Sequence, residues 1–273
     1  MSQTDNQQVF ETDFSVIDIH NHVFPDHIAL RAAESIRDYY KLPMYGDGTL
    51  QTMLDRAGEF RVEHFFVCSA ALKPEKVRTA NEFTAIQRAR SPRILSFGTT
   101  HAGVRDQIEV FRQIEAFGLS GVKLHPDFQG FAVDDERLDE AWRQAIRLKL
   151  PVLIHVGDPN SDLSSPSRVY RVMERFPELK IIAAHMGGYQ VKEAAECLVG
   201  THCYFDTSQW FYFLTEAEFL ERIEKHGVEK ILFGSDYPLN VADREIKRLL
   251  KTALPKEDRD AIFYRNAKNL FKL

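Results

Sequence analysis

Two histidines separated by a single residue, His20 and His22, are the residues whose type and spacing most clearly suggest chemistry in this chain. They follow an apolar, β-branched stretch, residues 16–19, that is typical of a buried strand. Because side chains two residues apart on a strand point to the same face, we expect the two imidazoles to converge just past the strand's end. Neutral imidazole is the commonest metal ligand among side chains, so the pair predicts a metal centre.

Two further residues can complete such a centre. His155 ends the apolar stretch 152–154, and Asp236 ends the stretch 230–235. Three imidazole nitrogens and one carboxylate oxygen suit Zn²⁺ or another divalent metal. We therefore predict that His20, His22, His155 and Asp236 are the metal ligands and that a water completes the shell. A bound metal would lower the pKa of this water toward neutrality.

Two residues are candidates for the catalytic steps. Asp236 could both contact the metal and accept the proton of the water. His185, which ends the apolar stretch 181–184, is left to polarise a substrate carbonyl or relay a proton. Asp18 lies two residues before His20 and is expected to accept an imidazole N–H or to bond within the barrel floor.

Lys123 and His125 share one face of another predicted strand. A lysine inside a barrel is costly unless it is paired or modified. Lys123 could be a carbamylated bridge between two metals, a cation for a substrate carboxylate, or one member of a buried ion pair. We favour the contact with a substrate carboxylate, and we expect His125 to contact substrate as well.

Structural roles compete with each of these assignments. Any single histidine can be a hydrogen-bonded core residue, Asp236 can cap a helix, and His185 can be a turn residue before two glycines. Three more histidines lie near strand starts or on predicted helices and are expected to be structural: His64, His202 and His226.

Short β-like stretches must position these residues, and eight can be marked in the chain. They are Val16–His20, Val62–Cys68, Ile94–Thr99, Gly121–His125, Val152–Val156, Lys180–His185, Cys203–Thr207 and Lys230–Asp236. Helical patterns fill the intervals, as at 136–148, 167–176 and 217–226. Eight βα units predict a single-domain α/β protein, a (β/α)8 TIM barrel over residues 16–273, after a polar N-terminal extension, 1–15.

An open, doubly wound sheet is the alternative architecture. It would be favoured by a glycine-rich turn after the first strand, where this chain has His20-Asn21-His22. The interval between the first two strands, about 23–60, is long and contains a helical stretch, His27–Tyr40. Because loops at the C-terminal strand ends lie over the mouth of a barrel, we expect this segment to be a lid or specificity element.

Composition narrows the classes of partner. The chain has 273 residues and a net charge of -5, with no basic stripe, which argues against nucleic acid or an anionic membrane as a partner. No apolar run is long enough to span a membrane, and the three cysteines form no CxxC pair. We expect a cytoplasmic protein with a small-molecule substrate, and a homodimer is one assembly that fits.

Four motifs together resemble a known family. The DxHxH at 18–22, the HxG at 155–157, the HMGG at 185–188 and the FGSDYP at 233–238 are similar, in this order, to the amidohydrolase superfamily. The resemblance is to its amidohydrolase-related branch, which includes aminocarboxymuconate-semialdehyde decarboxylase. It implies a (β/α)8 barrel and one divalent metal, usually zinc, held at the four predicted ligand positions, with His185 catalytic. Superfamily members with two metals use a bridging lysine or glutamate on the fourth strand, where Lys123 lies.

The resemblance leaves the reaction open. Our main hypothesis is a metal-dependent hydrolase that uses activated water on the carbonyl carbon of an amide, lactone or ester in a small carboxylated or cyclic substrate. The alternative is a metal-dependent, non-oxidative decarboxylase of a small unsaturated or aromatic acid. A binding protein with a structural metal is a third interpretation, disfavoured because an open site beside Asp236 and His185 suits catalysis better.

Overall fold

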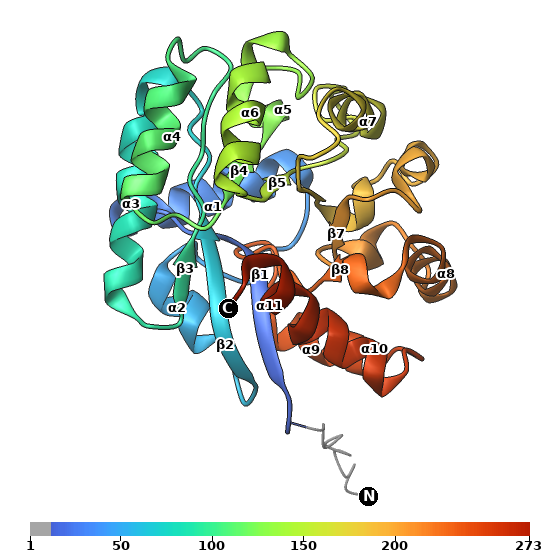
Figure 1. Ribbon diagram of the computed structural model, residues 1–273. Helices are drawn as coiled ribbons and strands as arrows, with labels where there is room; N and C mark the ends of the chain where they lie inside the picture. The colour runs from blue at the N-terminus through green and yellow to red at the C-terminus, as the bar shows by residue number, and fades with distance from the viewer. Residues whose placement is uncertain (1–11) are drawn as a thin grey trace, which may run out of the picture.

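The computed structural model describes residues 12–273, in which short parallel strands form a ring and helices pack around it (Figure 1). The N-terminal residues 1–11, most of the predicted extension, lie outside the described residues. The strands are β1 (Ser15–His22), β2 (Arg61–Cys68), β3 (Ile94–Ser96), β4 (Val122–Leu124), β5 (Val152–Ile154), β6 (Ile181–Ala183), β7 (Tyr204–Asp206) and β8 (Ile231–Leu232).

The strands follow one another around the ring in chain order. One sheet contains β1-β2-β3 and the other β4-β5-β6-β7-β8, with every pairing parallel. Single bridges join the sheet edges, Gly98 to Val122 on one side and Asn21 to Tyr237 on the other. This arrangement confirms the predicted TIM barrel and excludes the doubly wound sheet.

Eleven α-helices are described between residues 12 and 273, most of them outside the ring. They are α1 (Asp26–Tyr40), α2 (Leu50–Asp55), α3 (Val77–Gln87), α4 (Gln107–Ala116), α5 (Pro126–Gln129), α6 (Asp139–Leu148), α7 (Pro166–Arg175), α8 (Glu216–His226), α9 (Ala242–Leu250), α10 (Lys256–Asp260) and α11 (Asn266–Phe271). The three predicted helical stretches correspond to α6 with the short turn before it, to α7 and to α8. In α6, apolar residues at helical spacing bury one face: Ala141, Trp142 and Ala145.

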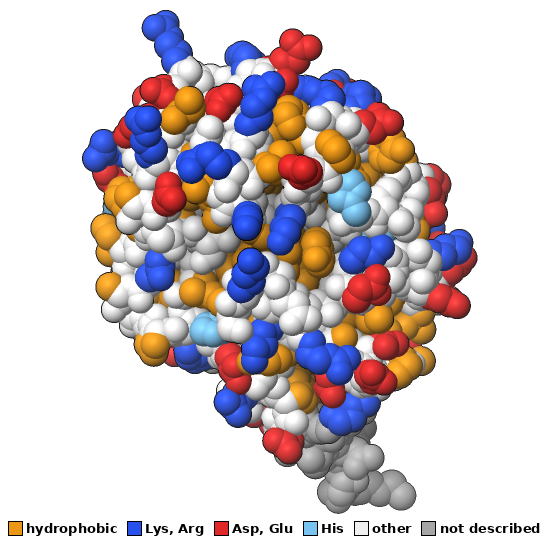
Figure 2. All heavy atoms as spheres, in the orientation of Figure 1, with side chains coloured by type: hydrophobic (Ala, Val, Ile, Leu, Met, Phe, Trp, Pro, Cys, Tyr) orange, Lys and Arg blue, Asp and Glu red, His pale blue; other side chains and the backbone are white. Residues whose placement is uncertain are grey.

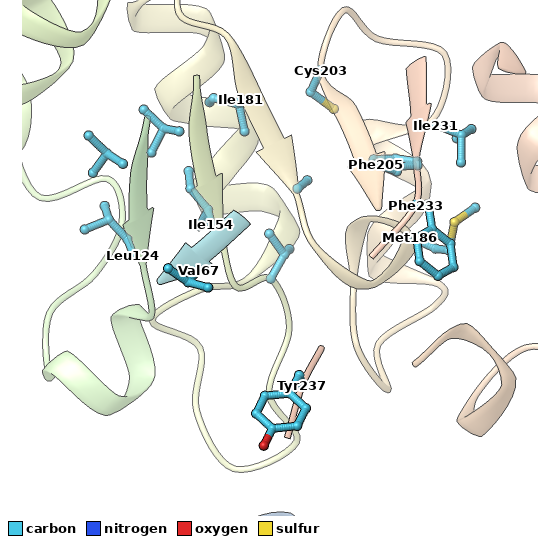
Figure 3. Packing of buried hydrophobic residues seen from close by; sticks show 14 of the residues in the cluster. Val67, Leu124, Ile154, Ile181, Met186, Cys203, Phe205, Ile231, Phe233 and Tyr237 are labelled. Carbon is cyan, nitrogen blue, oxygen red and sulfur yellow. The ribbon is translucent and has the colours of Figure 1, made fainter. Parts of the chain in front are cut away.

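Strand side chains alternate between two cores, as the pleat requires. On β5, Val152 and Ile154 belong to the larger core between strands and helices, while Leu153 packs inside the ring with Ile182 and Leu232. Figure 3 shows part of the larger core, with Leu124 and Ile154 on neighbouring strands. At one end of the ring, Ala267 and Leu270 of α11 pack against the inner core and cover it.

Strands β3 to β8 are shorter than the apolar stretches suggested, whereas β1 and β2 are slightly longer. The predicted strand Lys180–His185 ends at Ala183, and His185 and Met186 adopt left-handed φ angles of 58° and 53°. Asp236, four residues past the end of β8, has φ 59°. Non-glycine residues with positive φ are uncommon, and they cluster where a structure holds a side chain in a particular direction. Here the turns redirect apolar stretches that would otherwise have continued as strands.

The segment between β1 and β2 contains α1 and α2, and α1, called the lid helix below, borders the cavity at the mouth of the barrel. The role of this segment as a lid or specificity element stays a prediction. The segment is fastened at its far side by Tyr237, whose hydroxyl oxygen lies 3.0 Å from Asp47 Oδ1 and accepts the Gly48 N–H at 3.1 Å. Gly46 lies against the Tyr237 ring so closely that an added Cβ would collide with it. The segment therefore has a built-in attachment to the loop that carries Asp236.

Acidic and basic side chains are interspersed over the face seen in Figure 2. Within residues 12–273, no helix is both long enough and apolar enough to cross a membrane.

Candidate active site

Three of the four predicted ligands converge at the mouth of the barrel. His20 Nε2 lies 3.2 Å from His22 Nε2, and Asp236 Oδ1 lies 3.4 Å and 3.6 Å from these two nitrogens. The side chain of His20 is fully buried, while His22 keeps 14% of its surface exposed. The HxH pair and the carboxylate after β8 thus meet from neighbouring strands of the closed ring.

The spacing of these donor atoms fits a metal ion. Tetrahedral ligands at zinc bond lengths stand about 3.3 Å apart, and the three donors stand 3.2–3.6 Å apart. A bond from His20 Nδ1 to Asp206 Oδ2 at 2.8 Å places the proton of this imidazole on Nδ1 and its lone pair on Nε2, the nitrogen that faces the other donors. Two imidazoles and a carboxylate suit zinc or another divalent cation.

Asp206, which the sequence analysis did not single out, orients the centre from below. It is fully buried at the end of β7, and its Oδ1 accepts the backbone N–H groups of His185 and Ser208, both at 3.0 Å. It is the acceptor of the His20 imidazole, a role considered for Asp18. Asp18 Oδ1 instead accepts backbone N–H groups, those of His20 at 3.2 Å and Ser235 at 3.0 Å.

His155 lies next to the three converging donors but is directed elsewhere. Its Nδ1 lies 3.0 Å from His185 Nε2, and its Nε2 lies 3.3 Å from the Tyr40 hydroxyl. The structure therefore brings together His20, His22 and Asp236 and places His155 with His185, the predicted catalytic histidine. His155 as fourth ligand stays a prediction.

His125, predicted to contact substrate, stacks between two rings. The centroid of its imidazole lies 3.9 Å from the centroid of the His155 imidazole, with 9° between the two planes. It lies 4.0 Å from the centroid of the Phe128 ring. Asp127 also lies close to this pair. Parallel stacked imidazoles direct their in-plane lone pairs side by side, so they cannot meet at a single ion. We therefore do not read this cluster as a second metal site.

Lys123 lies beneath the donors and does not line the cavity. It is fully buried, and its Nζ lies 2.8 Å from His20 Nε2. Burial lowers the pKa of Lys123, opposed by the charges of Cys68, Asp236 and Asp206. A contact between Lys123 and a substrate carboxylate would have to be made past the metal position, whereas His125 borders the cavity directly.

Burial keeps the imidazoles of the site neutral. It lowers the pKa of His20, His125 and His185 well below 6.5, and that of His155 to about 4. Burial raises the pKa of Asp236 to about 7, opposed by the positive charge of Lys123. Neutral imidazole is the form that binds metals, so these environments suit ligation.

A cavity of about 580 Å³ opens above the donors. Helix α1 supplies one wall with Ile28, Ile36 and Tyr40, and aromatic residues from other loops supply much of the rest. Among the described residues that line it, Asp236 is the single carboxylate, and there is no lysine or arginine. Arg168, in the first turn of α7, forms ion pairs with Asp134 and Asp162 and does not line this cavity.

Some residues of the site left little signal in the sequence. Asp206 lies next to the end of the predicted strand Cys203–Thr207. A search for polar residues at strand ends, which found Asp236 and the histidines, could therefore have found Asp206 as well. Ser208 and Gln209 follow it; Gln209 Nε2 donates to Asp236 Oδ2 at 3.2 Å. Tyr40 comes from the lid helix, and no spacing relates it to the strand ends that it meets.

Comparisons with known proteins bear on the family and the fold of this chain. The Amidohydro_2 family model, described as amidohydrolase, matches residues 17–273. A gamma-resorcylate decarboxylase from Polaromonas sp. strain JS666 is 25% identical over 259 residues, covering 73% of this chain and 77% of the relative.

Two solved structures share the fold. An uncharacterised TIM-barrel protein from Bordetella bronchiseptica has a TM-score of 0.76 at 18% identity, covering 95% of this chain and 99% of the other. A dihydroxybenzoic acid decarboxylase from Polaromonas sp. JS666, with bound manganese and the inhibitor 2-nitroresorcinol, has a TM-score of 0.73 at 20% identity, covering 95% and 97%. From the family match over residues 17–273, this chain belongs to the amidohydrolase family of the Amidohydro_2 model.

Proposed function

We propose that this protein is a metal-dependent, non-oxidative decarboxylase of a small aromatic or unsaturated carboxylic acid. The observation that carries the proposal is the placement of the three donors at the base of a cavity with largely apolar and aromatic walls. Because none of the described residues that line that cavity is a lysine or arginine, the acid group of a substrate would find its positive partner at the metal position. The curated decarboxylase relative supports the same class of reaction.

The residues present can supply what decarboxylation needs. When the bond to the carboxylate breaks, its electron pair stays on the ring or alkene carbon, carbon dioxide leaves, and a proton is added at that carbon. A bound divalent metal would hold and polarise the oxygens of the substrate. His20, His22 and Asp236 would hold the metal, with His155 as the proposed fourth ligand and Zn²⁺ as the proposed ion. Asp236 and His185 border the cavity and are the proposed proton carriers.

Hydrolysis is the rival activity of the same residues. There Asp236 would accept a proton from water as the water attacks a carbonyl carbon, with His185 polarising the carbonyl. The two activities differ in their products, so substrates can separate them.

The test combines metal analysis with product detection. Purified protein should contain about one divalent metal per chain, and it should release carbon dioxide from gamma-resorcylate or a related aromatic acid. Removal of the metal with a chelator should abolish this release, and adding back zinc or manganese should restore it. Turnover of lactones, amides or esters without carbon dioxide release from any acid would contradict the proposal and favour the hydrolase.

A pair of variants locates the chemistry. His185→Asn should lower kcat by about 10²–10⁴-fold while the metal content stays near one per chain. His101→Asn is the matched control, because His101 Nε2 contacts the Gln129 carbonyl at 3.0 Å and does not line the cavity. Loss of metal from His185→Asn would mean that His185 is a ligand rather than a proton carrier.

A further inference from the structure

A continuous chain of hydrogen bonds crosses the site beside the metal donors. It joins buried polar groups of β6, β7 and β5 loops to the lid helix and to the first turn of α5. Its members, in order, are Asp206, Ser208, His185, His155, Tyr40, His125 and the backbone N–H of Phe128. The spacings after the short Ser208–Asp206 contact are 2.8, 3.0, 3.3, 3.1 and 3.4 Å.

The direction of each bond follows from the Asp206 end. A carboxylate only accepts, so the Ser208 hydroxyl donates to Asp206 Oδ1. The Ser208 oxygen must then accept from His185, which places the proton of that imidazole on Nδ1 and a lone pair on Nε2. His185 Nε2 in turn accepts from His155, whose proton is therefore on Nδ1 as well.

The same directions follow independently from the Phe128 end. A backbone N–H only donates, so His125 Nδ1 carries a lone pair and its proton is on Nε2. His125 Nε2 donates to the Tyr40 oxygen, and the Tyr40 hydroxyl donates to His155 Nε2. His155 must again carry its proton on Nδ1. Two fixed ends, a carboxylate and a backbone amide, thus assign the same tautomer to His155.

No other neutral arrangement satisfies the chain. Reversing any one imidazole would bring two lone pairs or two N–H groups face to face in a buried site, which leaves buried polar atoms unpaired. The tautomers of a metal-binding or catalytic histidine are normally set by the partner of its second nitrogen. Here two hydroxyls, one from the β7 loop and one from the lid helix, supply that partner.

We propose that Ser208 and Tyr40 are positioning residues that hold His185 and His155 in the Nδ1–H tautomer. His155 then carries its lone pair on Nε2, the nitrogen to which the Tyr40 hydroxyl donates. Since Tyr40 is the last residue of α1, the position of the lid is linked to the state of His155. The value of this arrangement for turnover rests on the proposed function; the tautomers themselves do not.

Nitrogen NMR on the metal-free protein tests the tautomers without any assay of turnover. In ¹⁵N-histidine-labelled, chelator-treated protein, His185 and His155 should show the Nδ1–H pattern and His125 the Nε2–H pattern. Ser208→Ala removes the acceptor of the His185 Nδ1–H, so the nitrogen signals of His185 should change, whereas His155, which is also fixed from the Phe128 end, should keep the Nδ1–H pattern. Ser208→Thr keeps a hydroxyl and should restore the wild-type pattern.

Tyr40→Phe tests the other end against a matched control. Losing the Tyr40 hydroxyl should change the signals of His155 and His125, whereas Tyr39→Phe should not change them, because the Tyr39 hydroxyl donates to Asp158 Oδ2 at 3.1 Å. Wild-type signals in both Ser208→Ala and Tyr40→Phe, or equal changes in the two tyrosine variants, would overturn the proposal. If Ser208→Ala does not fold, the Tyr40→Phe and Tyr39→Phe pair decides alone.

Kinetic measurements then test whether the tautomers affect the rate of the reaction. Ser208→Ala and Tyr40→Phe should each lower kcat by about 10–100-fold, and Ser208→Thr should recover most of the loss. Altered tautomers with unchanged kcat would show that the chain orders the imidazoles without serving turnover. A wild-type protein that decarboxylates no acid but shows the expected tautomers would contradict the proposed function alone.

Discussion

The hydrogen bond from His20 to Asp206 determines which nitrogen of the His20 imidazole can bind a metal. An imidazole has two nitrogens, and only the one without a proton can bind a metal. Asp206 accepts from Nδ1 at 2.8 Å, so Nε2 faces His22 and Asp236 with its lone pair. The backbone amides that also bond Asp206 keep the carboxylate from turning away.

Asp206→Asn is expected to weaken metal binding. The amide keeps the size of the side chain but has a single oxygen, which cannot serve His20 and the backbone amides together. Affinity for Zn²⁺ should fall by about 10–100-fold, measured by competition with a chromophoric chelator. Asp158→Asn is the control, since Asp158 contacts Tyr39 at the cavity mouth rather than a donor. Equal affinities in wild type and Asp206→Asn would contradict this role of Asp206.

At the scale of residues, the sequence predicted those that combine a chemical type with a strand-end position. His20, His22 and Asp236 meet as expected, and Lys123 is buried close to them. Spacing along the chain could not indicate the direction of the His155 ring, because it depends on contacts from other loops. The sequence likewise held no sign that Tyr40 would reach two imidazoles from a helix outside the ring.

Among the elements, both strands and loops position the reactive side chains. His20 and His22 lie within β1, whereas β3 to β7 are three residues long and β8 has two, so His155, His185 and Asp236 come after the regular pairing stops. Apolar stretches predicted the existence and order of all eight strands, since β-branched and aromatic residues mark them. They could not predict the ends, because a left-handed turn such as that at His185 depends on what the turn must contact.

The lid segment depends on one side chain of the β8 loop. Tyr237→Phe should free residues 44–49, because the hydroxyl lies 2.9 Å from the Thr49 carbonyl oxygen as well as close to Asp47 and Gly48. We expect faster hydrogen exchange in 44–49, a loss of about 1–3 kcal/mol in the free energy of unfolding, and a KM that rises more than kcat falls.

The control for this loosening is another tyrosine outside the mouth. Tyr204 begins β7, at the opposite end of its strand, and Tyr204→Phe should leave exchange in 44–49 unchanged. Unchanged exchange in Tyr237→Phe would show that the packing of Gly46 against the ring, rather than the hydroxyl, holds the segment.

At the scale of the whole molecule, the candidate active site lies at one end of the ring and apolar packing fills the other end. The mouth holds polar groups that need particular partners, and the opposite end is filled by α11 and apolar strand residues. His226 belongs to the framework, as the sequence suggested. It ends α8, its Nε2 donates to the Cys203 carbonyl at 2.9 Å, and its ring stacks on Phe205 at 3.8 Å.

This framework histidine should make the fold sensitive to acid. Burial lowers the pKa of His226 from 6.5 to about 4, so between these values the unfolded chain takes up a proton that the native protein excludes. Its contribution to stability is therefore complete above pH 6.5 and is lost as the pH falls toward 4. The associated slope is at most about 1 kcal/mol per pH unit.

His226→Gln should flatten that dependence. The amide can still accept the Gly200 N–H with its oxygen and donate with its nitrogen, but it does not titrate. Urea unfolding of metal-free protein from pH 7 to 4.5 should show a smaller loss of stability in the variant than in wild type. His27→Gln, at an exposed position of α1, should keep the wild-type slope. A constant difference between wild type and His226→Gln at every pH would mean that the ring acts by packing alone, because only a titrating group makes the difference change with pH.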